Sequence, residues 1–267
     1  MPTRAAMDQL KNDLVVMGEM CENALSSAIM ALIDRDEDMA RGTIRYDGEI
    51  DEMELTVDAR CVQLLEGGGL KDKPLRFVAA AMKINNDLER IGDHGVEVCE
   101  HVLFLVQERT VLTQVVDFSS LVEQVGQMMR ESVRALVEED VALAWKMLDE
   151  YPVVRDEVGL IFSEILEVME ESPRAIERCC HILAVSKALE RVAALTANVA
   201  EEVIYLVEGR TVRHHIEEHH PVGPPVLAGA REPAREVEER EADLVRRHSR
   251  RLEKKRETRG RPAAKKR

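Results

Sequence analysis

Aromatic residues are scarce in this chain of 267 residues. They make up 3% of it, with a single tryptophan, whereas 45% of the residues are hydrophobic, mostly leucine, valine, alanine, isoleucine and methionine. Because β-sheets favour aromatic and β-branched side chains, this composition suits helices packed on helices better than a β-sandwich. The apolar share is large enough to form a sizeable buried core.

Long hydrophobic runs are also missing. No stretch approaches the 18 apolar residues of a membrane-spanning helix, and the N-terminus lacks the apolar segment of a signal peptide. The cysteines number five and follow no CxxC or Cys/His spacing. We therefore expect a cytoplasmic protein whose thiols are reduced.

Catalytic and nucleotide-binding motifs are absent from the sequence. It contains no GxSxG, no HExxH and no P-loop, and the glycines at 67–69 are not followed by the GK[ST] that a P-loop requires. We therefore expect a protein that acts by binding and is not an enzyme.

The net charge of −14 is unevenly distributed along the chain. Residues 1–220 hold 22 basic and 43 acidic residues, a net charge of −21, whereas residues 221–267 hold 15 basic and 8 acidic residues, a net charge of +7. An acidic body argues against nucleic acid as the main partner and is compatible with binding cations or a basic protein. The basic tail could contact anionic lipid or RNA, although such tails are more often simply solvated.

Apolar residues recur every three or four positions in six segments, which is the period of an amphipathic helix. We predict helices over about 4–34, 37–66, 74–107, 119–138, 140–171 and 173–208. Gly67, Gly68 and Gly69 follow the second of these segments and Gly209 follows the last, where a left-handed glycine often closes a helix. Pro74 and Pro173 suit the first turns of two others, and Pro152 is expected to kink the fifth.

The chain repeats itself with an offset of 101 residues. Residues 88–111 and 189–212 share 11 identities in 24 positions, and each copy closes a set of three predicted helices. We therefore predict an all-α fold of two tandem antiparallel three-helix bundles, at 4–112 and 115–215. A Pro/Gly linker and basic charged tail follow at 216–267, with too few apolar residues to form more than a lone helix in a mostly disordered segment.

Stacked pairs of carboxylates occur on two predicted helices of the first repeat. Asp47 and Asp51 lie four residues apart, as do Glu89 and Asp93, so each pair occupies one helix face. If the helices are antiparallel neighbours, the four carboxylates could converge and repel each other, and a hard or borderline cation would relieve that repulsion. The alternative is that they belong to solvated helix faces, where acidic pairs are common.

Histidines are weaker candidates for metal ligands. His94 stands beside Asp93, but a lone helical histidine is more often a packing or surface residue. Four more histidines lie between 214 and 220, just past the last predicted helix, where their plainest role is to complement the helix dipole.

Two strings in register with the repeat resemble a known family. The PhoU signature NDLERIGD is matched by INNDLERIGDH at 84–94, and the family's LERIADHATNIAEEVIYLVEG is matched in part at 189–209. The segment KPLR at 73–76, at the start of the third predicted helix, also matches. The resemblance covers about 7–215. It implies two three-helix bundles and, often, a homodimer.

The resemblance also implies a function, namely regulation of phosphate uptake and of phosphate-starvation signalling. Proteins of this family act as adaptors between the ATPase subunit of the phosphate ABC transporter and a sensor histidine kinase, and keep the response off when phosphate is plentiful. Such a protein reaches the membrane only through its partners, and we expect no nucleic acid among them. Regulation of a sodium- or proton-coupled phosphate carrier is an alternative that the sequence does not separate from this one.

Some family members bind iron or another divalent or trivalent metal through E/DxxxD motifs, and the resemblance assigns these motifs to Asp47, Asp51, Glu89 and Asp93. The second repeat departs from this pattern, because Ala194 replaces Asp93 and mainly Glu190 and Glu201 remain. We therefore expect one metal site in the first repeat and a degenerate one in the second. A carboxylate-bridged metal enzyme is a further alternative, although Glu89 lacks the histidine three residues later that such bundles use.

Overall fold

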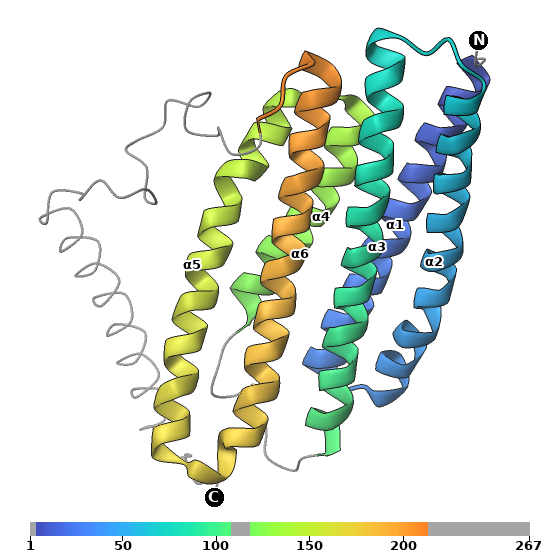
Figure 1. Ribbon diagram of the computed structural model, residues 1–267. Helices are drawn as coiled ribbons and strands as arrows, with labels where there is room; N and C mark the ends of the chain where they lie inside the picture. Colours follow the sequence, from blue (N-terminus) through green and yellow to red (C-terminus); the bar gives the residue numbers. More distant parts are fainter. Residues whose placement is uncertain (1–3, 108–117, 213–267) are drawn as a thin grey trace, which may run out of the picture. The chain divides into compact units, whose positions relative to one another are not determined.

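Six α-helices make up the described part of the computed structural model, residues 4–107 and 118–212 (Figure 1). They are α1 (Arg4–Asp34), α2 (Glu37–Glu66), α3 (Asp72–Gln107), α4 (Ser119–Glu138), α5 (Val141–Glu171) and α6 (Ile176–Glu208), with a short 3₁₀ turn, η2 (Pro173–Ala175), before α6. The predicted all-α fold is confirmed, and the expected helix bounds agree with the observed ones to within three residues. The predicted linker and tail at 216–267 lie outside the described residues.

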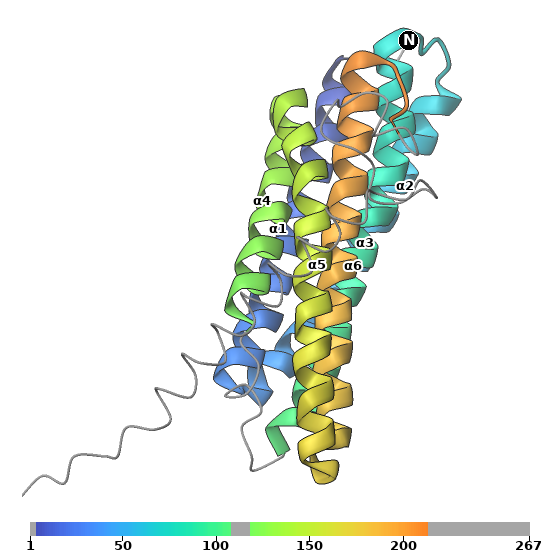
Figure 2. The same ribbon diagram turned by 90° about the vertical axis from the view of Figure 1, so that its left-hand side faces the viewer.

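The two three-helix repeats lie side by side in one compact unit. Their most extensive contact is between α3 and α6, and α1 also touches α4 (Figure 2), while α2 and α5 lie at opposite outer edges (Figure 1). α3 and α6 run antiparallel, because Lys83 near the start of α3 contacts Glu202 near the end of α6, whereas His101 near the end of α3 contacts His181 near the start of α6. We call this contact the α3–α6 seam.

Aliphatic side chains and methionines form a core that continues through both repeats. Leu88 on α3 and Leu189 on α6 occupy equivalent repeat positions and are 1% and 0% exposed. Met17, Met128 and Met129 are also buried, as expected of flexible side chains that fill irregular gaps. A chain with few aromatic residues thus closes its core with interdigitating aliphatic groups.

Corresponding turns of the two repeats are built in the same way. Asp36 accepts a hydrogen bond from the Met39 N–H at the start of α2, and Asp140 accepts one from the Leu143 N–H at the start of α5, both at 2.9 Å. Each carboxylate satisfies a backbone donor that the first helical turn leaves unpaired. Gly209 ends α6 in the left-handed conformation, with a φ of 74°.

Glycine and proline mark two local features of the predicted helices. Gly67, the residue directly after α2, stays right-handed with a φ of −64°, and the left-handed residues are Gly68 and Gly69. The predicted glycine break after α2 is therefore confirmed, and its left-handed conformation falls on the second and third glycines. Pro152 lies inside α5, which runs from Val141 to Glu171, and the kink expected there stays a prediction.

Among the described helices, only α1 is long and apolar enough to cross a membrane by length and composition. Its apolar face is buried in the bundle, where Leu10, Leu14, Met17 and Cys21 are at most 1% exposed. The hydropathy of α1 is therefore explained by its place in the core.

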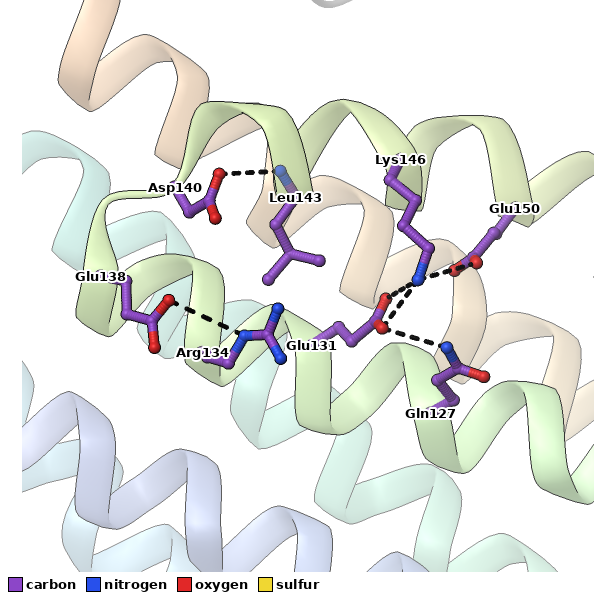
Figure 3. Close-up of polar contacts among 8 residues, drawn as sticks. All are labelled: Gln127, Glu131, Arg134, Glu138, Asp140, Leu143, Lys146 and Glu150. Carbon is purple, nitrogen blue, oxygen red and sulfur yellow. Dashed lines mark hydrogen bonds and ion pairs between the residues drawn. The ribbon is translucent and has the colours of Figure 1, made fainter.

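A polar network joins α4 and α5 (Figure 3). The Lys146 amine lies 2.8 Å and 3.0 Å from the two oxygens of Glu131 and 3.3 Å from Glu150, and the Gln127 amide also donates to Glu131. Burial tends to raise the pKa of Glu131, but hydrogen bonds from Lys146 and Gln127 hold that pKa below its ordinary value.

Lys146→Ala is expected to lower the free energy of unfolding by only about 0.5–1 kcal/mol, because the lysine is half exposed and water screens its ion pairs. A depressed folded-state pKa stabilises the protein above the unfolded pKa and loses that effect as the pH falls. The cost of removing Lys146 should therefore fade on acidification, as urea titrations at pH 7.5 and pH 3.5 would measure. An undiminished loss at the lower pH would contradict the role of the Glu131 charge.

Candidate functional site

The four carboxylates predicted in the first repeat all lie on the two helices α2 and α3, which pack against each other. They are close enough to act on one another electrostatically. Burial raises the pKa of Asp47 to about 6, and the charges of Asp51 and Asp93 add to the rise. Burial also raises the pKa of Glu89, with further contributions from Asp93, Asp51, Glu54 and Asp47. The faces of α2 and α3 that carry these carboxylates therefore lie along one seam, which also includes Glu54.

Gly92 allows this close approach, and sequence reasoning missed it. A Cβ added there would lie 3.0 Å from Oδ1 of Asp47 and 3.2 Å from Cδ1 of Ile50, so a larger residue would push the Asp47 carboxylate away from α3. The second repeat has Ala193 at this position. A glycine between Glu89 and Asp93 was the signal that could have identified it.

Cys21 on α1 lies beneath the carboxylates. Its thiol donates to the Leu88 carbonyl oxygen at 3.2 Å. Burial raises the pKa of Cys21 to about 12, and the charges of Asp47 and Glu89 contribute. Without a bound cation, Cys21 therefore remains a neutral thiol at pH 7.

The charge of the four carboxylates is not neutralised by basic side chains. Within residues 4–107 and 118–212, no lysine or arginine forms an ion pair with any of them. Arg90, the neighbour of Glu89 in sequence, pairs with Asp87 at 3.7 Å, and the His94 ring bonds Glu97 at 2.8 Å. Uncompensated carboxylates at a helix seam are chemically suited to a hard cation with oxygen ligands.

The carboxylates of this site lie farther apart than the ligands of a bound metal ion do. No three His, Cys, Asp or Glu side chains in the described residues are arranged to hold one metal. Asp51 and Asp93 are exposed, whereas Asp47 and Glu89 are partly buried. A metal ion would therefore have to draw at least three of these carboxylates closer together, and the metal assignment stays a prediction.

The second repeat does not assemble a matching cluster. Glu190, equivalent to Glu89, is already paired with Lys187 at 2.6 Å, where the first repeat has Asn86. Glu201 follows Glu190 by 11 residues on the same helix, a rise of roughly 16 Å. These two carboxylates therefore cannot share one ion.

A cleft of about 760 Å³ lies elsewhere, lined by residues from the start of α1, the α2–α3 turn and the end of α6. Lys73 and Lys11 both pair with Glu139 at its edge. None of the six predicted metal-ligand residues lines this cleft, so the cleft and the carboxylate cluster are separate features.

Asp47→Asn is expected to raise the free energy of unfolding of chelator-treated protein by about 1–2 kcal/mol at pH 7.5. A carboxyl whose folded-state pKa is raised stabilises the fold at low pH, and that stabilisation is lost as the pH rises through about 6. The gain should therefore be much smaller at pH 4.5. Urea titrations at both pH values measure this gain in stability. Asp8→Asn, on an exposed turn of α1, is the control. Equal gains at the two pH values would contradict the charge-repulsion argument.

The chain resembles known proteins over nearly all of its described residues. A family model described as the PhoU domain matches twice, at 14–102 and 118–203, one match in each repeat. Two curated relatives are named phosphate-specific transport system accessory protein PhoU homolog. The one from Pseudomonas aeruginosa is 32% identical over 79% of this chain and 87% of its own length, and the one from Aquifex aeolicus is 30% identical over 79% and 96%. The crystal structure of PhoU from Pseudomonas aeruginosa superposes with a TM-score of 0.75, covering 77% of this chain and 99% of the other.

Proposed function

The chain belongs to the PhoU family of phosphate-transport accessory proteins, and from this membership we propose that it is a cytoplasmic adaptor between the phosphate ABC transporter and a sensor histidine kinase. Its effect would be negative regulation of the phosphate-starvation response when phosphate is plentiful. The observation that carries the proposal is the double family match, because both repeats are retained and packed as one unit. The adaptor works by binding, without making or breaking bonds.

The charge of the body supports docking on basic protein surfaces. Residues 1–220 carry a net charge of −21, and Glu49, Asp51 and Glu52 are exposed on α2. Complementary charge steers association and sets partner choice more than it raises affinity. The contacts with the transporter ATPase and the kinase should therefore be transient and weaken with salt.

A metal ion bound by the carboxylates on α2 and α3 would give this adaptor a second means of regulation. We infer that Asp47, Asp51, Glu89 and Asp93 hold iron or another divalent or trivalent metal. A bound cation would supply positive charge at a seam where the described residues offer no ion-pairing lysine or arginine. It would thereby change the electrostatic surface that a partner meets, and a homodimer would present two such surfaces.

Affinity capture of the full chain from its native host tests the adaptor role. Recovery of the phosphate ABC transporter ATPase and a histidine kinase, lost at high salt, is the expected result. Recovery of a sodium- or proton-coupled phosphate carrier instead would reassign the protein to that carrier. Capture of neither kind of carrier, or turnover of an oxidant or phosphoester by the metal-loaded protein, would overturn the proposal.

Gly92→Ala and Asp93→Asn are each expected to weaken iron binding at least about tenfold, a loss typical of disturbing a ligand or its support. Gly92→Ala acts by displacing Asp47, since the added Cβ would lie 3.0 Å from its oxygen. Metal analysis after anaerobic loading and dialysis measures the loss, with Glu190→Gln as the matched control in the second repeat. Equal loss in the control would place the metal elsewhere.

A further inference from the structure

The α3–α6 seam has two related ends with different chemistry. The offset of 101 residues places His101 and Phe104 at the positions of Glu202 and Tyr205. At one end the Lys83 amine lies 3.1 Å from both oxygens of Glu202 and 5.2 Å from the centre of the Tyr205 ring. This end joins the repeats by opposite charges.

At the other end two like groups face each other. The Nδ1 atoms of His101 and His181 are 2.9 Å apart. The His181 ring also stacks on Phe104, with ring centroids 3.8 Å apart and planes inclined by 12°. Two imidazoles in this position can share one proton or one metal ion, and Phe104 limits the rotation of His181.

The His101 ring is suited to act as a neutral ligand. Both histidine rings are partly buried, and burial, followed by the proximity of His181, lowers the pKa of His101 despite the opposing charges of Glu97 and Glu100. At pH 7 the His101 ring is therefore uncharged and keeps a lone pair for a metal. The carboxylates of Glu97 and Glu100 also favour a cation here.

We propose that His101 and His181 form a binding site for a divalent late transition-metal ion, which would join the two repeats through one Nδ1 ligand from each. With metal–nitrogen distances of about 2.0–2.1 Å, two nitrogens 2.9 Å apart subtend an angle of roughly 90° at the ion. That is the angle between adjacent ligands in the square-planar and octahedral geometries of Cu²⁺ and Ni²⁺. A tetrahedral Zn²⁺ would require the nitrogens to separate to about 3.3–3.4 Å.

The site is incomplete in protein ligands and separate from the carboxylate cluster. No third His, Cys, Asp or Glu in the described residues completes it, so water fills the remaining positions. Its nitrogen ligands prefer borderline metals, whereas the oxygens of the α2–α3 seam prefer harder ions. Only the histidine site offers nitrogen ligands, so nitrogen hyperfine structure distinguishes copper bound there from copper bound by the carboxylates.

Cu²⁺ titration of the full chain, followed by electron paramagnetic resonance, tests the proposal. The histidines between 214 and 220 could bind copper themselves, so every protein compared carries four further substitutions: His214→Gln, His215→Gln, His219→Gln and His220→Gln. The expected result is one tightly bound Cu²⁺ with nitrogen hyperfine structure. His101→Gln and His181→Gln should each weaken binding at least about tenfold, while His94→Gln and Asp93→Asn should not.

A second measurement separates ligand loss from misfolding. Ni²⁺ should raise the melting temperature of the parent, because an ion that binds only the folded state stabilises it, and this shift should vanish in His101→Gln/His181→Gln. Circular dichroism of that double variant establishes that the helices persist. If the double variant binds Cu²⁺ as tightly as its parent, with the same spectrum, the pair is only a shared hydrogen bond and the proposal fails.

Discussion

Leu88→Ala is expected to lower the free energy of unfolding by about 3–5 kcal/mol, the largest effect of any single substitution considered for this protein. Leu88 lies on α3, is 1% exposed and belongs to the core that continues between the repeats. Alanine would remove buried methyl groups and leave a cavity that rigid helices on both sides cannot close.

The internal repeat supplies a stringent test of this prediction. Leu189 occupies the equivalent position on α6 and is 0% exposed, so Leu189→Ala should cost nearly the same. Leu55→Ala, at a residue that is 66% exposed, should change stability by less than about 0.5 kcal/mol. Urea titrations give all three values, provided that the m-value is unchanged. A cost below about 1 kcal/mol for Leu88→Ala would show that the seam is not a packed core.

Lys83→Met is expected to cost about 2–3 kcal/mol, the second largest effect. Glu202, the partner of Lys83, is 2% exposed, and removing Lys83 takes from it a positive charge that water replaces poorly at a buried position. The cost should fall below the full range for buried pairs, because the lysine itself is 47% exposed.

A double-mutant cycle identifies the buried charge as the cause. Lys83→Met/Glu202→Leu should recover most of the lost stability, since a well-packed apolar pair can replace a buried ion pair. The matched control is Lys187→Met, which breaks the same kind of ion pair, with Glu190, within one helix and at a more exposed place. This substitution should lower the free energy of unfolding by less than about 1 kcal/mol. If the double variant is no more stable than Lys83→Met, the ion pair does not account for the loss.

The helices could be predicted closely because their signals are local. Asp36 and Asp140 precede apolar periodic segments, and Gly209 follows one, so the caps mark the bounds of α2, α5 and α6. Within the glycine turn after α2, backbone hydrogen bonding decides which of the three glycines is left-handed. Gly67 continues the right-handed backbone because its N–H still bonds the Gln63 carbonyl oxygen, which leaves the reversal to Gly68.

The candidate site could be predicted only in part. The i, i+4 spacing placed Asp47, Asp51, Glu89 and Asp93 on two helix faces, and the structure shows that these faces meet. Gly92 was missed because its importance lies in the space that it leaves for Asp47, a contact between helices that no local pattern encodes.

The sequence by itself determined the helices, the double repeat and the acidic body, since these follow from periodicity, capping residues and charge along the chain. Only the tertiary structure decided which residues meet across the α3–α6 seam. His101 and His181 are 80 residues apart in sequence and carry no shared motif. They meet because the antiparallel packing of α3 on α6 brings the end of one helix to the start of the other, and that packing depends on side-chain shapes from both repeats at once.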